Sequence, residues 1–203
     1  MSVVTETHSK RSEREAGLVL VAGMAGLMWI VEVIDQISGG DLERYGIRPH
    51  HAAGLVGIVT APFLHAGFGH LVANTIPFLA LGATIALSGL ARVAAATAIV
   101  ALVAGLGTWL VAPATTDHIG ASGIVFGYAA YLVARGAYSR SVLHLAVGFV
   151  VLAVYGTTLA LGVIPTDGIS WQGHLFGAIG GVVAARALDR RRARPSERPA
   201  LAA

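Results

Sequence analysis

The sequence contains no cysteine, and only 12% of its 203 residues are charged. Without cysteine the chain can form no disulfide, no thiolate metal site and no cysteine nucleophile. Soluble domains carry about 25% charged residues, so this chain has too few to cover a surface that faces water on all sides. Its mean hydropathy of +0.72 and its 55% of hydrophobic residues indicate an integral membrane protein.

The charge that is present is mainly basic, with a net value of +3 and a pI near 9.7. Proteins that bind nucleic acid have such a balance, but here the Lys and Arg residues stand beside apolar runs. Membrane topology and anionic lipid explain that placement better. We therefore expect membrane lipid as a partner and no nucleic acid.

The apolar residues form blocks of helix-spanning length, at about 16–34, 70–88, 92–112, 121–135, 141–164 and 171–188. The 26 glycines suit a membrane bundle, where small residues let helices approach closely. The pattern predicts an all-α membrane protein with a six-helix bundle over residues 16–189. A mobile cytoplasmic tail is expected over 1–15, and a basic, disordered cytoplasmic tail over 190–203. A signal peptide is the alternative for the first block, but the block is long and no clear A-x-A cleavage site follows it.

The first loop, residues 35–69, has two parts. The stretch DQISGGDLERYGIRPHH is polar, whereas AGLVGIVTAPFLHAGFG is apolar but too short to span, and Pro62 interrupts it. A run of 10–14 apolar residues is typical of a re-entrant or interfacial segment. We expect this loop to be associated with the membrane.

The orientation follows from the Lys and Arg residues, which favour the cytoplasmic side. Six spans place both termini on one side, which then receives twelve basic residues and leaves only Arg44 and Arg48 opposite. We therefore expect both termini in the cytoplasm of a bacterium, with the helices in its plasma membrane.

A few strongly polar side chains lie inside the predicted spans, where they are costly and usually functional or paired. His70, Asn74, Ser122 and His174 all lie in the first turns of even-numbered spans, which start on the outer side. At a rise of 1.5 Å per residue they share a depth within roughly 10 Å of the outer surface. His144 begins the fifth span on the cytoplasmic side and cannot join them.

Glycines indicate which of these helices touch. Gly120 and Gly123 flank Ser122 and let the backbone turn tightly and approach a neighbour. In the sixth helix glycines recur every four residues, at Gly173, Gly177 and Gly181. Such a stripe packs closely against another helix, and the fourth helix offers Gly123 and Gly127. We predict that these two helices are in contact and bring His174 beside Ser122.

Acyl transfer needs a nucleophile, a base that takes its proton, and donors for the developing oxyanion. Ser122 and His174 suit the first two roles. His70 and Asn74, four residues apart on one helix face, suit the third. No acidic residue lies at this depth to orient the histidine, so a Ser–His dyad is expected, with no metal and no cofactor.

Three segments together resemble the rhomboid intramembrane serine proteases. Residues 65–74, HAGFGHLVAN, resemble the family's H-x4-H-x3-N motif, and residues 120–123, GASG, resemble its G-x-S-G motif. Residues 173–181, GHLFGAIGG, resemble its final histidine helix with spaced glycines. The resemblance covers residues 16–189 and implies an endopeptidase that cuts single-pass transmembrane proteins near the outer membrane boundary.

The resemblance also implies a role for each matched residue. Ser122 is the nucleophile and His174 the general base, while His70, Asn74 and the Ser122 backbone N–H form the oxyanion hole. Gly120 and Gly123 support the serine, and His65 has a more structural role. The family often has tyrosine four residues after the serine. Phe126 stands there in this chain, and it can pack against the His174 ring but cannot donate a hydroxyl hydrogen bond.

Plainer explanations exist for each residue alone. Ser122 could bond its own helix, His174 could be interfacial, and His70 with Asn74 could clamp two helices. Two other functions also stay open. One is a catalytically weak rhomboid-like protein for membrane binding or quality control, although such relatives usually lack the serine or the histidine. The other is a transporter or metal site using His65, His70 and His174, for which carboxylate support is missing from these spans.

Overall fold

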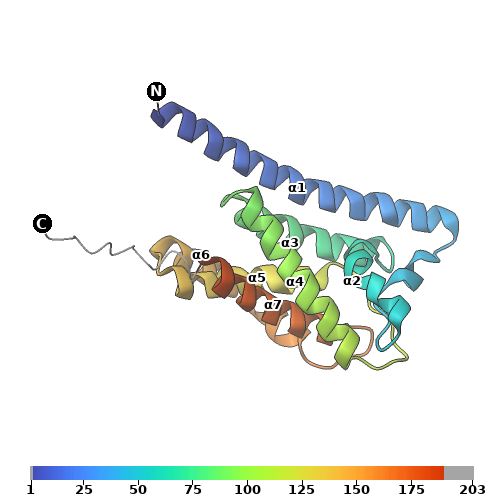
Figure 1. Ribbon diagram of the computed structural model, residues 1–203. Coiled ribbons are helices and arrows are strands. Elements are labelled where there is room, and N and C mark those ends of the chain that lie inside the picture. Colours follow the sequence, from blue (N-terminus) through green and yellow to red (C-terminus); the bar gives the residue numbers. More distant parts are fainter. Residues whose placement is uncertain (1, 190–203) are drawn as a thin grey trace, which may run out of the picture.

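The computed structural model describes residues 2–189, with side chains from residue 9 onward. This part of the chain contains long helices joined by short segments, and the helices form one bundle (Figure 1). The long helices are α1 Ser2–Ser38, α3 Phe68–Ala86, α4 Leu90–Val111, α5 Ser122–Ser139, α6 Val142–Gly162 and α7 Trp171–Asp189. The predicted all-α bundle is confirmed.

Four helices are long and apolar enough to cross a membrane by themselves: residues 9–38 of α1, and α3, α4 and α6. α5 and α7 are less apolar because they lie inside the bundle, where neighbouring helices cover them. Tyr128 and Tyr131 of α5, for example, are fully buried. The number of six spans therefore stays a prediction.

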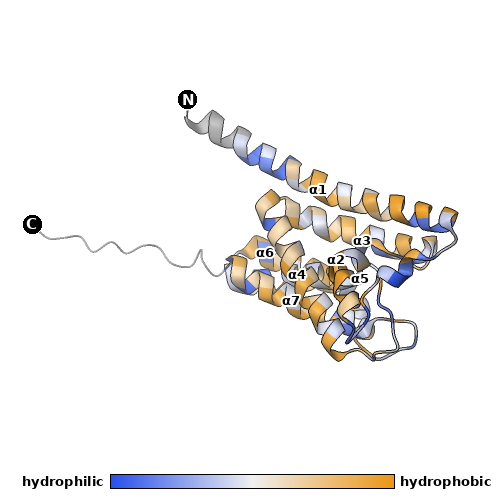
Figure 2. Ribbon diagram, turned by 45° about the vertical axis from the view of Figure 1, so that its right-hand side comes forward, coloured by the Kyte–Doolittle hydropathy of each residue, from blue (hydrophilic) through white to orange (hydrophobic). Residues whose placement is uncertain are grey.

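The N-terminal segment differs from the expected tail. α1 is already helical at Ser2 and continues without a break through the apolar run to Ser38. In Figure 2 its described early turns are hydrophilic and its later turns hydrophobic. The predicted start near residue 16 thus marks where the helix becomes apolar, and residues 2–15 extend the same helix. The basic tail predicted over 190–203 lies outside the described residues.

The first loop contains the turn η1 Leu42–Tyr45 and three consecutive helical segments, η2 Ala52–Val56, α2 Gly57–Thr60 and η3 Ala61–Phe63. The three together form one short apolar helix, Ala52–Phe63. As the sequence predicts, no segment here is long enough to span. Val56 and Val59 are exposed, which suits a loop that touches lipid. Gly57 lies against the backbone of Gly46 and Ile47, where any side chain would overlap main-chain atoms.

α5 and α7 approach each other through their glycines. A methyl group built on Gly123 would lie 3.2 Å from the Gly173 carbonyl oxygen, and one built on Gly177 or Gly181 would overlap the α5 backbone. The contact predicted between these two helices is therefore present. The end at which α1 begins is also the end at which α7 finishes (Figure 1), so the catalytic candidates at the start of α5 and α7 lie at the opposite end.

Candidate active site

Ser122 is the first residue of α5, and the turn before it requires glycine. Gly120 has φ of 102°, in the left-handed region that glycine adopts without strain. Its N–H donates to the Ala61 carbonyl of the first loop over 2.9 Å, which fixes the turn. Because the first N–H groups of a helix have no partner within that helix, the Ser122 side chain lies beside free backbone donors.

His174 lies over the same face of α5 as Ser122. Phe126, one turn further along α5, stacks on the His174 ring with centroids 4.0 Å apart and planes 7° apart. Residues four apart share a helix face, so this stacking places the imidazole on the Ser122 side of the helix. The close approach of Gly123 to Gly173 brings the adjoining backbones together at the same level.

The main chain of α6 orients the His174 ring. Nδ1 lies 2.8 Å from the carbonyl oxygen of Gly162, the last residue of α6. A carbonyl oxygen only accepts, so Nδ1 carries the proton and Nε2 of the neutral ring is free to accept one. Position 162 needs glycine because a side chain would overlap the Phe126 ring. This orienting group was missed in the sequence analysis, which searched for an acidic side chain.

His70 and Asn74 lie against Gly120, two residues before Ser122. A methyl group on Gly120 would be 2.8 Å from His70 Nε2 and 3.9 Å from Asn74 Nδ2. The Ala66 N–H donates to His70 Nδ1 over 3.3 Å, which leaves the proton of a neutral ring on Nε2. Asn74 Nδ2 donates one hydrogen to the His70 carbonyl oxygen over 2.9 Å and keeps a second. Both side chains therefore offer an N–H group close to the serine turn.

His65 is buried beneath this pair of donors. Its ring meets the His70 ring edge to face, with centroids 5.1 Å apart and an interplanar angle of 66°. Burial, together with the neighbouring His70, lowers the pKa of His65 to about 4, so its ring is neutral at physiological pH. The structure therefore has a neutral His65 ring packed on the His70 ring.

His118 is a further residue at this end of the bundle, and the sequence analysis did not single it out. Its Nδ1 lies 2.7 Å from Ser170 Oγ, and its Nε2 lies 2.9 Å from Thr116 Oγ1. Its backbone pairs with Ile47 in both directions, at 2.9 and 3.0 Å. His118 thus ties the segment before α5 to the first loop and to the start of α7. The sequence feature that could have indicated His118 is its position four residues before Ser122.

An open cavity of about 570 Å³ adjoins His174. Its lining combines the histidine and Phe126 with mostly apolar residues from the end of α6 and the segment after it: Thr158, Leu161, Gly162, Ile164, Thr166 and Ile169. Within residues 9–189, no three His, Cys, Asp or Glu side chains are grouped so that they could hold a metal ion. The cavity therefore suits an apolar ligand beside the His174 ring.

Comparison with known proteins gives a consistent result. The rhomboid domain family matches residues 52–191. An uncharacterized protein of Mycobacterium tuberculosis is 45% identical over 96% of this chain and 85% of its own length. One from Mycobacterium leprae is 45% identical over 91% of this chain and 76% of its own. The Bacillus subtilis protein named "Putative rhomboid protease YdcA" is 27% identical, over 61% of this chain and 62% of its own.

Proposed function

The chain belongs to the rhomboid family, a family of intramembrane proteases, and we propose that it is an active serine endopeptidase with a Ser122–His174 dyad. The observation that carries the proposal is the double constraint on His174. Phe126 stacks on its ring and the Gly162 carbonyl binds Nδ1. Together these contacts leave Nε2 as an unprotonated base on the Ser122 side.

In the first step, Ser122 Oγ attacks the carbonyl carbon of the scissile peptide bond while His174 Nε2 takes the hydroxyl proton. The imidazolium that forms keeps its Nδ1–H bond to Gly162, where the carbonyl dipole stabilises the new positive charge. Among the described residues no hydrogen bond joins Ser122 Oγ to His174. Such bonds are often long in a free enzyme and tighten when the substrate binds.

The oxyanion of the tetrahedral intermediate needs donors on the side of Ser122 that faces Gly120. In this proposal His70 Nε2–H, the second hydrogen of Asn74 Nδ2 and the Ser122 backbone N–H supply them, and the nearness of His70 and Asn74 to Gly120 supports the first two. Preorganised donors of this kind are usually the largest single contribution to catalysis of acyl transfer. Since His70 donates as a neutral ring, it does not compete electrostatically with the imidazolium of His174.

In the second step, His174 Nε2–H gives its proton to the leaving nitrogen, the C–N bond breaks, and an ester forms on Ser122. A water molecule then attacks the ester carbonyl while Nε2 takes a proton from it. Collapse of the second tetrahedral intermediate breaks the ester bond and returns the proton to Ser122 Oγ. Every step uses side chains and backbone of this chain, with no cofactor.

The substrates are proposed to be single-pass transmembrane proteins. The cavity beside His174 has a largely apolar lining and lies at the end of the bundle where α5 and α7 begin. It suits an apolar segment that enters from the membrane. A helix has to unwind before its backbone can be attacked, so cleavage near small or helix-breaking residues is expected. With both termini in the cytoplasm, this site would lie near the outer face of the bacterial plasma membrane.

A catalytically weak, rhomboid-like binding protein is the second candidate, favoured by the missing Ser122–His174 hydrogen bond and by Phe126 in place of tyrosine. A fluorophosphonate probe separates the two functions. Wild type should be labelled and should cleave a model transmembrane substrate, whereas Ser122→Ala should do neither while melting normally. Ser141→Ala, which changes a serine at the other end of the bundle, should keep both activities. Equal labelling and cleavage by Ser122→Ala and wild type would disprove the assignment, and an unlabelled, inactive wild type would favour the binding protein.

A further inference from the structure

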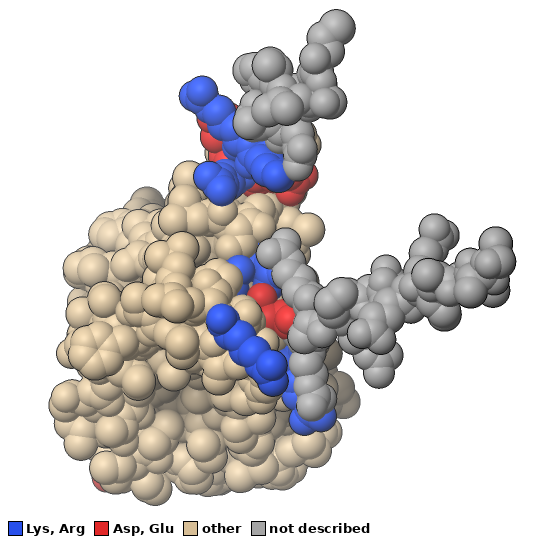
Figure 3. Space-filling model, turned by 90° about the vertical axis from the view of Figure 1, so that its left-hand side faces the viewer, with Lys and Arg blue, Asp and Glu red and all other residues tan. Residues whose placement is uncertain are grey.

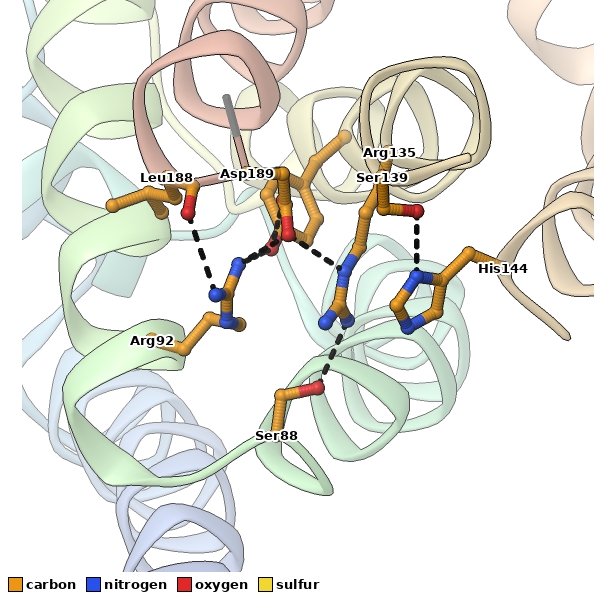
Figure 4. Close-up of polar contacts among 8 residues, drawn as sticks. Ser88, Arg92, Arg135, Ser139, His144, Leu188 and Asp189 are labelled. Carbon is orange, nitrogen blue, oxygen red and sulfur yellow. Dashed lines mark hydrogen bonds and ion pairs between the residues drawn. The ribbon is translucent and has the colours of Figure 1, made fainter. Parts of the chain in front are cut away.

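The end of the molecule opposite to the candidate active site holds a buried charge cluster (Figure 4). Asp189 Oδ1, at the end of α7, accepts from Arg92 Nη1 of α4 over 2.8 Å and from Arg135 Nε of α5 over 3.4 Å. Asp189 is only 3% exposed and Arg135 only 5%. One carboxylate thus faces two guanidinium groups. Buried charges are normally paired, and among residues 9–189 this cluster has one more positive than negative charge.

The arginines of this cluster line a cavity of about 770 Å³, a volume typical of ligand sites. Lys10 and Arg14 of α1 line the other side, and Glu13 is the one carboxylate among the described lining residues. Lys10 and Arg14 therefore bring further basic side chains to the cavity that Arg92 and Arg135 line. Figure 3 shows that the basic side chains on this face of the molecule form two groups, one on the early turns of α1 and one on the bundle below it.

Arg135 retains donors for a ligand. Its Nε donates to Asp189, and its Nη1 donates to Ser88 Oγ over 2.9 Å. Its Nη2 has no acceptor among the described residues. Guanidinium groups bind phosphate oxygens through strong, charge-assisted hydrogen bonds. An anionic phosphate group in this cavity would bind to Arg135 and balance the extra positive charge of the described cluster.

Beside the polar residues Ser9, Thr84, Ser88 and His144, the wall of the cavity has an apolar part. Leu87, which follows α3, is 56% exposed, and Leu143 of α6 is 69% exposed. Leu132 and Val147 continue this wall. A ligand that matches both parts has an anionic head for the arginines and a hydrocarbon tail for the leucines. Free phosphate would use only the first part.

From this combination we propose that the cavity binds an anionic phospholipid. Its phosphate is held by Arg92 and Arg135 with Lys10 and Arg14, and its acyl chains run along Leu143 and Val147. The site is independent of the proposed proteolysis, since it lies at the other end of the bundle. Its occupation links the early turns of α1 to α4 and α5.

The test measures lipid binding by the full chain in detergent with native mass spectrometry, using phosphatidylglycerol and phosphatidylcholine as probes. Lys10→Gln/Arg14→Gln removes the α1 side of the site without touching the buried cluster. Arg11→Gln/Arg186→Gln removes the same charge from the same end, at residues that do not line the cavity. Arg11 pairs with Glu15 over 2.8 Å. Melting temperatures establish that both double variants are folded.

Wild type should bind phosphatidylglycerol in preference to phosphatidylcholine. Each basic residue near an anionic headgroup contributes about fivefold in affinity, so Lys10→Gln/Arg14→Gln should bind phosphatidylglycerol roughly 25-fold more weakly. Arg11→Gln/Arg186→Gln should stay within about twofold of wild type. Three results would overturn the proposal: equal losses in the two double variants, no loss in either, or equal binding of the two lipids by wild type. Displacement of the lipid by millimolar inorganic phosphate would instead assign the site to free phosphate and refute the lipid.

Discussion

The contact between α5 and α7 can be tested by one added methyl group. In Gly177→Ala the new Cβ would lie 2.1 Å from the Gly123 carbonyl oxygen, whereas real Cβ contacts essentially never fall below 3.0 Å. The obstructing atoms belong to the backbone, so no side chain can rotate away. The two helices must separate at this level by roughly 1 Å, a displacement large enough to lower catalysis about 10²-fold.

The same change has a smaller effect on stability. Overpacking a close-packed interior costs about 1–3 kcal/mol, and the better helix propensity of alanine returns up to about 1 kcal/mol. A net loss of about 1–2 kcal/mol leaves the protein folded. The catalytic effect is larger because Ser122 adjoins Gly123 on α5, and His174 lies on α7 one turn before Gly177. Separation at the glycine pair therefore moves nucleophile and base apart.

The test measures the rate of substrate cleavage, the rate of labelling and the melting temperature. Cleavage of a transmembrane substrate and labelling by a fluorophosphonate should both fall about 10²-fold in Gly177→Ala, with a modest decrease in Tm. Gly156→Ala in α6 is the matched control, because its Cβ would have no neighbour within 4 Å. It should keep wild-type rates within about twofold and melt at the same temperature or higher. A Gly177→Ala variant with wild-type rates would show that the close contact between α5 and α7 at Gly123 and Gly177 does not position Ser122 and His174 for catalysis.

The oxyanion donors are tested by His70→Ala and Asn74→Ala, each of which should reduce kcat roughly 10²–10³-fold, or about 2.7–4 kcal/mol, with little change in melting. Cleavage within about threefold of wild type by both variants would show that the Ser122 backbone N–H acts without them. The pKa of His65 is lowered in the folded chain to about 4, from an ordinary value of 6.5. Between these two pH values the unfolded chain binds a proton at His65 that the folded chain does not bind. The free energy of unfolding therefore decreases as the pH falls through this range. The Tm of the wild type should therefore drop between about pH 7 and about pH 5, and the Tm of His65→Phe should drop less over the same range. Identical dependence of Tm on pH in the two proteins would show that His65 does not cause the loss of stability. Reporter enzymes fused to the two termini should both report the cytoplasm, and one near Asp41 the outer side, whereas a C-terminal reporter outside would contradict the common depth of the site. Proteolysis should survive strong chelators, and activity lost in chelator but restored by zinc would favour the metal site.

Helix positions follow closely from the sequence wherever apolar runs end at glycine or at a polar segment. The run expected over 92–112 is α4, Leu90–Val111, and the run over 171–188 is α7, Trp171–Asp189. The run expected over 121–135 is α5. It continues to Ser139, because Arg135 is buried against Asp189 and does not need to reach water.

Patterns in the sequence predict which side chains form the candidate site. They do not predict the groups that orient these side chains. Spacing alone put His70 and Asn74 on one face, and the glycine stripes brought α5 and α7 together. The Gly162 carbonyl has no such signal, because every residue has one. Its position depends on where α6 ends relative to His174, which is a tertiary contact. His118 differs in part: its place four residues before Ser122 is visible in the sequence, but its bonds to Ser170 and Ile47 are tertiary contacts.

The His174 ring is oriented by two separate contacts, one with the Phe126 ring and one with the Gly162 carbonyl. Stacking at 4.0 Å fixes the plane of the His174 ring but leaves both tautomers possible, since a phenyl ring has no donor or acceptor. The Gly162 carbonyl selects the tautomer by accepting from Nδ1. A hydroxyl at position 126 is then unnecessary for either purpose. The end of α6 and the Phe126 ring thus each hold the His174 ring in a different way.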